Sequence, residues 1–185
     1  MCGPNAGNRL GGGVIIDGKI FSGAFYGGAE LGHQVIVVDG EPCTCGRKGC
    51  WEAYSSATAL IRMGREAALA NPDSLLHSIA GEGLAKMEAK TVFDAAQAGD
   101  EVAQRVLDEY LKYLAAGITN TINVFQPEVL IVGGGVSAQG EKLMEPLREL
   151  VRREVFGGQA DKTQLRAATL GNDAGVIGAA MLGIE

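Results

Sequence analysis

The strongest constraint on how this chain can fold is a set of three cysteines that follows closely on a histidine. The cysteines are spaced C-x-C-x4-C, and the histidine lies ten residues before the first of them. Zinc in proteins takes four ligands in a tetrahedron, and three thiolates with one imidazole satisfy it. The four candidate ligands are His33, Cys43, Cys45 and Cys50. The sequence therefore predicts that a zinc ion staples this loop.

Two glycines between the cysteines favour the same interpretation. Gly46 and Gly49 allow the chain to turn tightly enough for thiols so close in sequence to share one ion. The alternative is a group of buried or redox-active cysteines beside an unrelated histidine, which leaves the glycine spacing without a reason. A zinc site stabilises its loop because the free energy of metal binding becomes folding free energy. Taken alone, the cluster indicates zinc and does not indicate an enzyme.

The composition indicates a folded domain and argues against two kinds of partner. The 185 residues are 46% hydrophobic, which supports a buried core. The net charge of −6 argues against a nucleic-acid surface, because such a surface needs a basic patch that displaces counterions from phosphates. No apolar run reaches the roughly 20 residues of a transmembrane helix, and the start MCGPNAGNRL does not resemble a signal peptide. We therefore expect a cytoplasmic protein with no nucleic-acid or membrane partner.

The first half of the chain is expected to run from short strands into helices. In order, the predicted elements are a hairpin at residues 14–21, a strand at 34–38, a helix that ends at 71–72, and a weaker helical stretch at about 73–88. Asp17-Gly18 supplies the hairpin turn. Ser55 or Ser56 is the expected cap of the first helix, which Pro72 ends.

The second half alternates helices with strands. Apolar residues recur at three- and four-residue steps from about Asp100, which predicts one long helix that Pro127 stops. The segment EVLIVGGGVS then predicts a continuous apolar strand that runs into three glycines and a helix. A helix at about 139–155, a strand near 165–168 and a final helix from about Asp173 follow. This alternation predicts an α/β fold with helices packed on a sheet.

Residues on both sides of the cysteines carry a resemblance to a known family. Glu30-Leu31-Gly32-His33 matches E-x-G-H, and the segment from Cys43 to Glu52 matches C-x-C-G-x-x-G-C-x-E. The chain resembles the ROK family of bacterial sugar kinases and sugar-responsive repressors, and the similarity continues through VLIVGGGVS and GNDAGVIGAAMLG. The resemblance implies a ribonuclease H-like lobe of the actin/hexokinase type with a zinc-stapled loop. It also implies phosphorylation of a hexose by ATP, with glucose as the leading candidate.

The resemblance assigns roles to residues in and beside the cluster. It implies that His33 binds zinc through one ring nitrogen and faces the sugar with the other. Glu30 and Glu52 would hold sugar hydroxyls through charge-assisted hydrogen bonds, which discriminate strongly against a misplaced hydroxyl. Without the family match, the simpler interpretation is that both glutamates are ordinary solvated acids.

Two glycine clusters are candidates for nucleotide binding with Mg²⁺. In the family, a segment that ends in Gly11, Gly12 and Gly13 approaches the phosphates of ATP. Here Asn8 and Arg9 depart from that pattern, and residues 1–9 form an atypical start. The resemblance assigns the adenosine part of ATP to the three glycines after the apolar strand, namely Gly133, Gly134 and Gly135. Close packing of a helix on a strand explains this second cluster equally well.

The family's general base is the aspartate of an Asn-Asp pair upstream of E-x-G-H, and no such pair lies upstream of Glu30 here. Asn172-Asp173 lies on the wrong side of the signature and is interpreted as a helix cap. We therefore expect residues 1–185 to be the C-terminal, large lobe of a sugar kinase, without its N-terminal lobe, without a catalytic residue and inactive alone. The resemblance also implies a homodimer.

Three functions compete on this sequence. The first is an ATP-dependent hexose kinase, and the second is the sugar-sensing lobe of a ROK repressor. A helix-turn-helix domain upstream of Met1 would favour the repressor. The third is a zinc-stabilised fragment with no activity, which failure to bind any sugar would favour.

Overall fold

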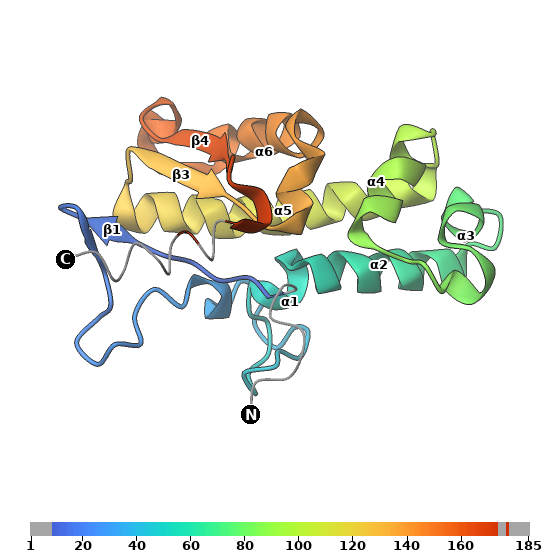
Figure 1. Cartoon of the computed structure of the whole chain (residues 1–185), viewed down its shortest axis with the longest axis horizontal. Coiled ribbons are helices and arrows are strands. Elements are labelled where there is room, and N and C mark those ends of the chain that lie inside the picture. The colour runs from blue at the N-terminus through green and yellow to red at the C-terminus, as the bar shows by residue number, and fades with distance from the viewer. Residues whose placement is uncertain (1–8, 174–176, 178–185) are drawn as a thin grey trace.

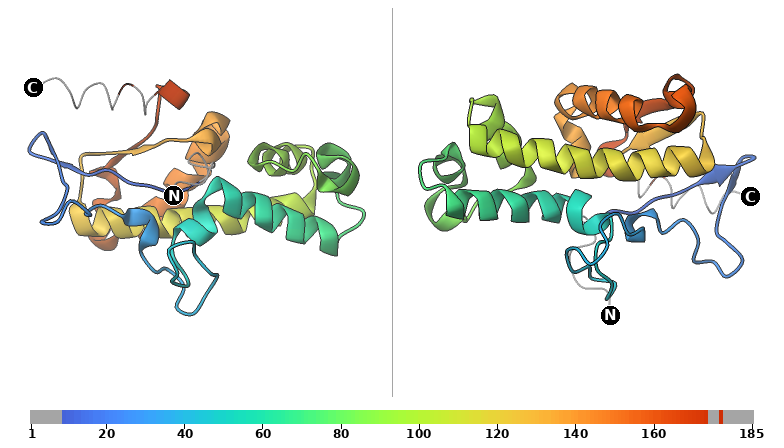
Figure 2. Two further views of the ribbon diagram at one scale, coloured as in Figure 1. Left: turned by 60° about the horizontal axis from the view of Figure 1, so that its bottom comes forward. Right: turned by 180° about the vertical axis from the view of Figure 1, so that it is seen from behind.

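The computed structural model describes residues 9–173 and residue 177. Its centre is one long helix, α5 (Glu101–Phe125), with α2 (Ala57–Ala70) along one side and α6 (Glu141–Glu154) along the other (Figure 1). Both views of Figure 2 keep α2 beside α5. The atypical start, residues 1–8, and nearly all of the predicted final helix after Asp173 lie outside the described residues.

The central helix confirms the prediction made from its apolar periodicity. Asp100 caps α5 by accepting a hydrogen bond from the backbone N–H of Ala103, 2.8 Å away. The helix ends where Gln126 adopts a left-handed backbone (φ 44°), one residue before Pro127. One stripe of α5 is buried along most of its length, and its larger buried apolar side chains are Val106, Leu107, Tyr110, Leu111, Leu114, Ile118 and Ile122.

The helices around α5 confirm some of the predicted boundaries. Ser56 caps α2, since its hydroxyl accepts from the N–H of Ala59. The weak helical stretch at 73–88 divides into α3 (Leu75–Ala80) and a 3-10 turn, η3 (Glu82–Leu84), because Gly81 between them has a φ of 74°.

The sequence analysis did not predict α4 (Ala89–Gln97). Its start is held by a reciprocal cap: the Glu88 side chain accepts from the N–H of Thr91, and the Thr91 hydroxyl accepts from the N–H of Glu88. This is a capping-box arrangement with glutamate in the place usually taken by serine or threonine.

The strands form two separate pairs among the described residues. β1 (Ile15–Ile16) and β2 (Lys19–Ile20) form the expected hairpin, whose turn residues Asp17 and Gly18 have φ of 52° and 73°. β3 (Val129–Val132) and β4 (Gln164–Ala167) are parallel, with Val129 opposite Gln164 and Val132 opposite Ala167. Figure 1 shows β3 and β4 over the C-terminal half of α5.

The strand predicted at residues 34–38 is wrong. Only an isolated bridge forms there, between Val35 and Cys50, while the N–H groups of Ile36 and Val37 both donate to the carbonyl of Gly49. The apolar run pairs with a sharply turning loop, and such a partner cannot extend a ladder.

The hydrophobic core lies between the helices. Its largest fully buried side chains come from α2, α3, α4, α5 and α6, and they include Leu60, Leu76, Val92, Tyr110, Ile118, Leu143, Met144 and Leu147. The cysteine loop projects from this body beside α1 (Glu52–Ser55) (Figure 2). No helix in the described part of the chain is both long enough and apolar enough to cross a membrane.

Candidate metal and sugar site

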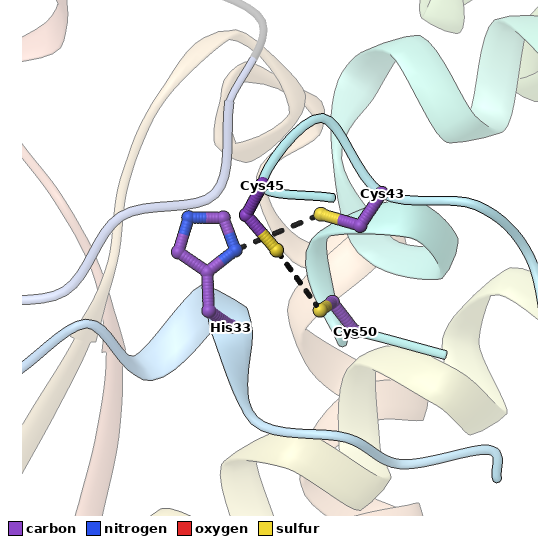
Figure 3. Close-up of side chains that lie close together, drawn as sticks. All are labelled: His33, Cys43, Cys45 and Cys50. Carbon is purple, nitrogen blue, oxygen red and sulfur yellow. Dashed lines mark hydrogen bonds between the residues drawn. The ribbon is translucent and has the colours of Figure 1, made fainter. Parts of the chain in front are cut away.

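The four residues that the sequence predicts as zinc ligands converge on one point (Figure 3). Their ligand atoms all lie within 4.8 Å of one another. The Sγ atoms of Cys45 and Cys50 are 3.6 Å apart, and the Sγ of Cys43 is 3.6 Å from Nδ1 of His33. In a zinc tetrahedron with Zn–S bonds of about 2.3 Å, neighbouring sulfurs are roughly 3.8 Å apart. The donor set and its spacing therefore fit zinc.

The loop reaches this geometry through a tight turn and a close backbone crossing. The N–H of Cys43 donates to the carbonyl of Arg47, and the N–H of Gly46 donates back to the carbonyl of Cys43. Gly49 has a φ of 75°, and a Cβ there would lie 1.6 Å from the carbonyl oxygen of Val37. Gly46 also has a left-handed backbone (φ 88°), but open space surrounds it. Both glycines thus have the backbone freedom that the sequence predicts, and Gly49 alone also needs the missing Cβ for the close crossing.

His33 ends the short 3-10 helix η2 (Leu31–His33), which starts after Glu30. Gly32 is buried in the middle of this turn, and a Cβ there would lie 2.0 Å from the carbonyl oxygen of Leu10. The guanidinium of Arg47 donates to the carbonyl of His33 at 3.4 Å, which links the histidine to the cysteine loop.

The thiols differ in electrostatic environment. Burial, reinforced by the neighbouring thiols, raises the pKa of Cys50 to about 12. A backbone hydrogen bond from Arg47 lowers the pKa of Cys45, with smaller contributions from Cys43 and Cys50. Zinc binds thiolates, so a cation here must offset the burial penalty at Cys50, and binding must release protons.

Trp51 anchors the cluster to α5. Its indole N–H donates to the carbonyl of Tyr113 at 3.0 Å, and a Cβ at Gly117 would lie 2.0 Å from the indole ring. The hydroxyl of Tyr110 donates to the carbonyl of Ser55 at 2.9 Å, which holds α1 to the same helix. The core therefore fixes the segment that directly follows Cys50.

Glu52 is brought to the cluster, and its carboxylate is nearly enclosed. It is 7% exposed, and its Oε1 lies 3.8 Å from the Sγ of Cys43. The same oxygen accepts from the hydroxyl of Thr44 at 3.2 Å, and Oε2 accepts from the N–H of Leu10 at 3.1 Å. Glu30 stands in contrast: it is exposed at the start of η2, three residues before His33.

The glycine clusters occupy two different turns. A Cβ at Gly12 would lie 2.6 Å from the side chain of Leu31, whereas Gly11 faces open space. Gly133, Gly134 and Gly135 are exposed between β3 and the 3-10 helix η4 (Gly135–Gln139), and Gly134 needs its glycine because its φ is 88°. A Cβ at Gly133 would touch only Ala168, at 3.4 Å, so close packing accounts for little of this cluster.

Two groups beside Glu52 were not anticipated from the sequence. Thr44 stands between two cysteines with no local pattern that indicates its contact. The N–H of Leu10 is a backbone donor 42 residues from its acceptor, so no residue type reveals it. The predicted Asn172-Asp173 cap and the helix that it would start lie at the edge of the described residues, and the side chain of Asn172 lies outside them.

Comparison with known proteins identifies relatives of the chain. A family model described as "ROK family" matches residues 6–185. A glucokinase from Thermotoga maritima is 40% identical over 176 residues, which are 95% of this chain and 55% of that enzyme. A xylose repressor from Caldicellulosiruptor bescii is 30% identical over 174 residues, 94% of this chain and 43% of the repressor. The chain thus spans about half the length of the curated relatives it matches.

Comparison with solved structures also identifies a ROK family protein. The crystal structure of a ROK family glucokinase from Streptomyces griseus, in complex with glucose and AMPPNP, superposes with a TM-score of 0.86 at 40% identity. The match covers 95% of this chain and 57% of that one. The α/β fold expected from the sequence is therefore confirmed, and the chain belongs to the ROK family.

Proposed function

We propose that this chain supplies the zinc- and sugar-binding half of an ATP-dependent hexose kinase, with glucose as the substrate. The observation that carries the proposal is Glu52, a carboxylate with little exposure to solvent, beside the four-residue cluster and fixed by two donors. Its relatives named as glucokinases support the reaction class.

The proposed sugar contacts come from three residues. Glu52 and Glu30 would accept hydrogen bonds from sugar hydroxyls, and His33 would present its second ring nitrogen to the sugar. A zinc ion held by His33 and the cysteines would rigidify the loop that leads to Glu52. The anchoring of Trp51 on α5 fixes the other side of that glutamate.

The proposed nucleotide contacts are backbone groups. Gly11 and Gly12 would lie near the phosphates, and Gly133, Gly134 and Gly135 near the adenosine, with Mg²⁺ bound by the phosphates. The exposed backbone of the second cluster supports this assignment, because glycines let a ligand lie directly against the chain. AMPPNP in the Streptomyces griseus structure supports ATP as the phosphoryl donor.

We assign no general base within these 185 residues. In this proposal they form one lobe, and the base that takes the proton of the attacking hydroxyl comes from a segment outside them. The lobes would close around the sugar and exclude water before phosphoryl transfer. We propose that the enzyme acts in the cytoplasm as a homodimer, on family membership alone.

The second candidate is the sugar-sensing lobe of a repressor. The similarity to the xylose repressor of Caldicellulosiruptor bescii favours it, because the match covers 94% of this chain. Such a lobe would use the same cluster and carboxylates to recognise a sugar, without transferring phosphate.

Fluorescence of Trp51 tests sugar binding, since it is the only tryptophan and directly precedes Glu52. We expect saturable quenching by glucose in the zinc-loaded chain. Glu52→Gln should weaken binding at least about tenfold, because it removes a charge-assisted hydrogen bond. Glu145→Gln, at an exposed position on α6, is the matched control and should bind normally. Absence of binding by the unmodified chain contradicts the proposal and favours the inactive fragment.

A coupled assay of ADP release with glucose and Mg-ATP tests the division into lobes. We expect no turnover from this chain alone. Turnover that Glu52→Ala abolishes would mean that a base exists within these residues.

The Trp51 fluorescence titration also tests the second candidate. Tight binding of xylose with no binding of glucose would favour the repressor.

A further inference from the structure

Each oxygen of the Glu52 carboxylate accepts a hydrogen bond from a group outside the four-residue cluster. The Sγ of Cys43 also lies 3.8 Å from Oε1, but a thiolate that binds zinc has no proton to donate. The hydroxyl of Thr44 reaches Oε1 at 3.2 Å, and the N–H of Leu10 reaches Oε2 at 3.1 Å. The terminal torsion of a glutamate side chain is broad, so a carboxylate without partners rotates readily. Donors on both oxygens fix the plane of the carboxylate, and the lone pairs that remain point in defined directions.

The two donors differ in what supports them. Leu10 belongs to the segment that lies against η2: a Cβ at Gly32 would lie 2.0 Å from the Leu10 carbonyl oxygen, and one at Gly12 would lie 2.6 Å from the Leu31 side chain. This backbone donor is therefore fixed by packing. Thr44 is exposed on the cysteine loop, so its side chain can be changed without disturbing a packed neighbour.

We propose that Thr44 is a positioning residue that sets the Glu52 carboxylate for a sugar hydroxyl. The inference rests on the proposed function, in which Glu52 binds the sugar. Thr44 acts through Glu52 and does not itself contact the reacting atoms. Thr44 lies between Cys43 and Cys45, and Glu52 is the first residue of α1. Closure of the cysteine loop around a metal ion would therefore also bring the Thr44 hydroxyl to the Glu52 carboxylate.

The test compares Thr44→Val with Thr44→Ser in the zinc-loaded full chain. Valine keeps the shape of threonine and removes the hydroxyl, whereas serine keeps the hydroxyl. We expect Thr44→Val to raise the glucose Kd roughly tenfold, the scale of one hydrogen bond to a charged group, and Thr44→Ser to stay within about twofold of the unmodified chain. Zinc content and Tm should be the same in all three proteins.

Two further variants separate positioning from a structural effect. Lys48→Ala changes an exposed side chain of the same loop and should leave the glucose Kd unchanged. In a Glu52→Gln background, adding Thr44→Val should weaken binding by less than about twofold, because the two residues act as a unit.

The outcomes are distinguishable. Equal glucose affinity for Thr44→Val and the unmodified chain overturns the role of Thr44 and leaves the proposed function standing. A tenfold loss that serine does not rescue, or that comes with loss of zinc, also overturns it. If the unmodified chain binds no glucose, the proposed function fails and this inference fails with it.

Discussion

Gly46 and Gly49 share a left-handed backbone in the cysteine loop but differ in their surroundings. At Gly46 an added Cβ would meet open space, whereas at Gly49 it would lie 1.6 Å from a backbone carbonyl oxygen that cannot rotate away. The first position therefore needs glycine only for its φ, and the second needs it for φ and for space. Substitutions at these two positions therefore distinguish the effect of backbone strain from the effect of lost space where the loop crosses Val37.

We predict that Gly49→Ala abolishes stoichiometric zinc binding, while Gly46→Ala retains it. An alanine at position 49 must move the backbone at Val37 away from the loop, which separates Cys50 from the other ligands. At position 46 an alanine must adopt a left-handed backbone, which costs about 1 kcal/mol of stability. Metal analysis of the purified proteins gives the zinc content. Normal zinc content in Gly49→Ala would show that the crossing at Val37 is not required.

At the scale of elements, one carboxylate joins two helices. Asp100 is 8% exposed, and it accepts from the N–H of Ala103 at the start of α5 and from the N–H of Leu75 at the start of α3. Burial acts to raise its pKa, but the backbone donors and the hydroxyl of Ser74 outweigh it, so the pKa lies below the ordinary 3.8. The ionised form is therefore stabilised by folding.

We predict that Asp100→Ala lowers the free energy of unfolding by about 1–2 kcal/mol at pH 7, the scale of a lost N-cap. Because the folded-state pKa is depressed, this contribution is complete above the unfolded pKa and is lost as pH falls through the folded one. The difference between the variant and the unmodified chain should then shrink below about pH 4. Urea denaturation followed by circular dichroism measures it. Asp108→Ala, at an exposed position on α5, should cost at most a few tenths of a kcal/mol.

Asp100→Asn refines this prediction, since an amide oxygen still accepts but carries no charge. The free energy of unfolding of Asp100→Asn at pH 7 should lie between that of Asp100→Ala and that of the unmodified chain. A loss in Asp100→Ala that persists unchanged at pH 3 would contradict the assignment to the ionised carboxylate.

At the scale of the whole molecule, the cysteine loop and the helical body have different sources of stability. The body buries an apolar core between α2, α4, α5 and α6, whereas few side chains of the loop are buried. Within the described residues, Trp51, at the end of the loop, is the main side chain that packs into that core. The loop depends on its turn hydrogen bonds and, in the proposed function, on zinc.

We predict that removing zinc with a chelator unfolds the loop and leaves the helices intact. Helical circular dichroism should be retained, while hydrogen exchange over residues 34–50 accelerates and exchange in α5 stays slow. Glucose binding should disappear and return when zinc, but not Mg²⁺, is added back. Loss of helical signal on chelation would show instead that the metal supports the whole lobe.

The sequence determined the features that depend on local patterns. The ligand types and spacing predicted the cluster, the apolar periodicity predicted α5, and Asp17-Gly18 predicted the hairpin turn. Ser56 is one of the two caps expected for α2, and α5 begins next to Asp100, where the sequence places its start. In each case the physical cause acts over a few residues, so the sequence alone contains it.

Tertiary structure alone decided the remainder. The segment QVIVV at 34–38 predicted a strand, but the chain opposite it turns, so no ladder forms. The Glu52 carboxylate is held by the N–H of Leu10, which is 42 residues away in the sequence. Trp51 needs a glycine at position 117 and a carbonyl 62 residues away, at Tyr113. These contacts join segments whose separation is set by how the helices pack, and packing depends on the whole core.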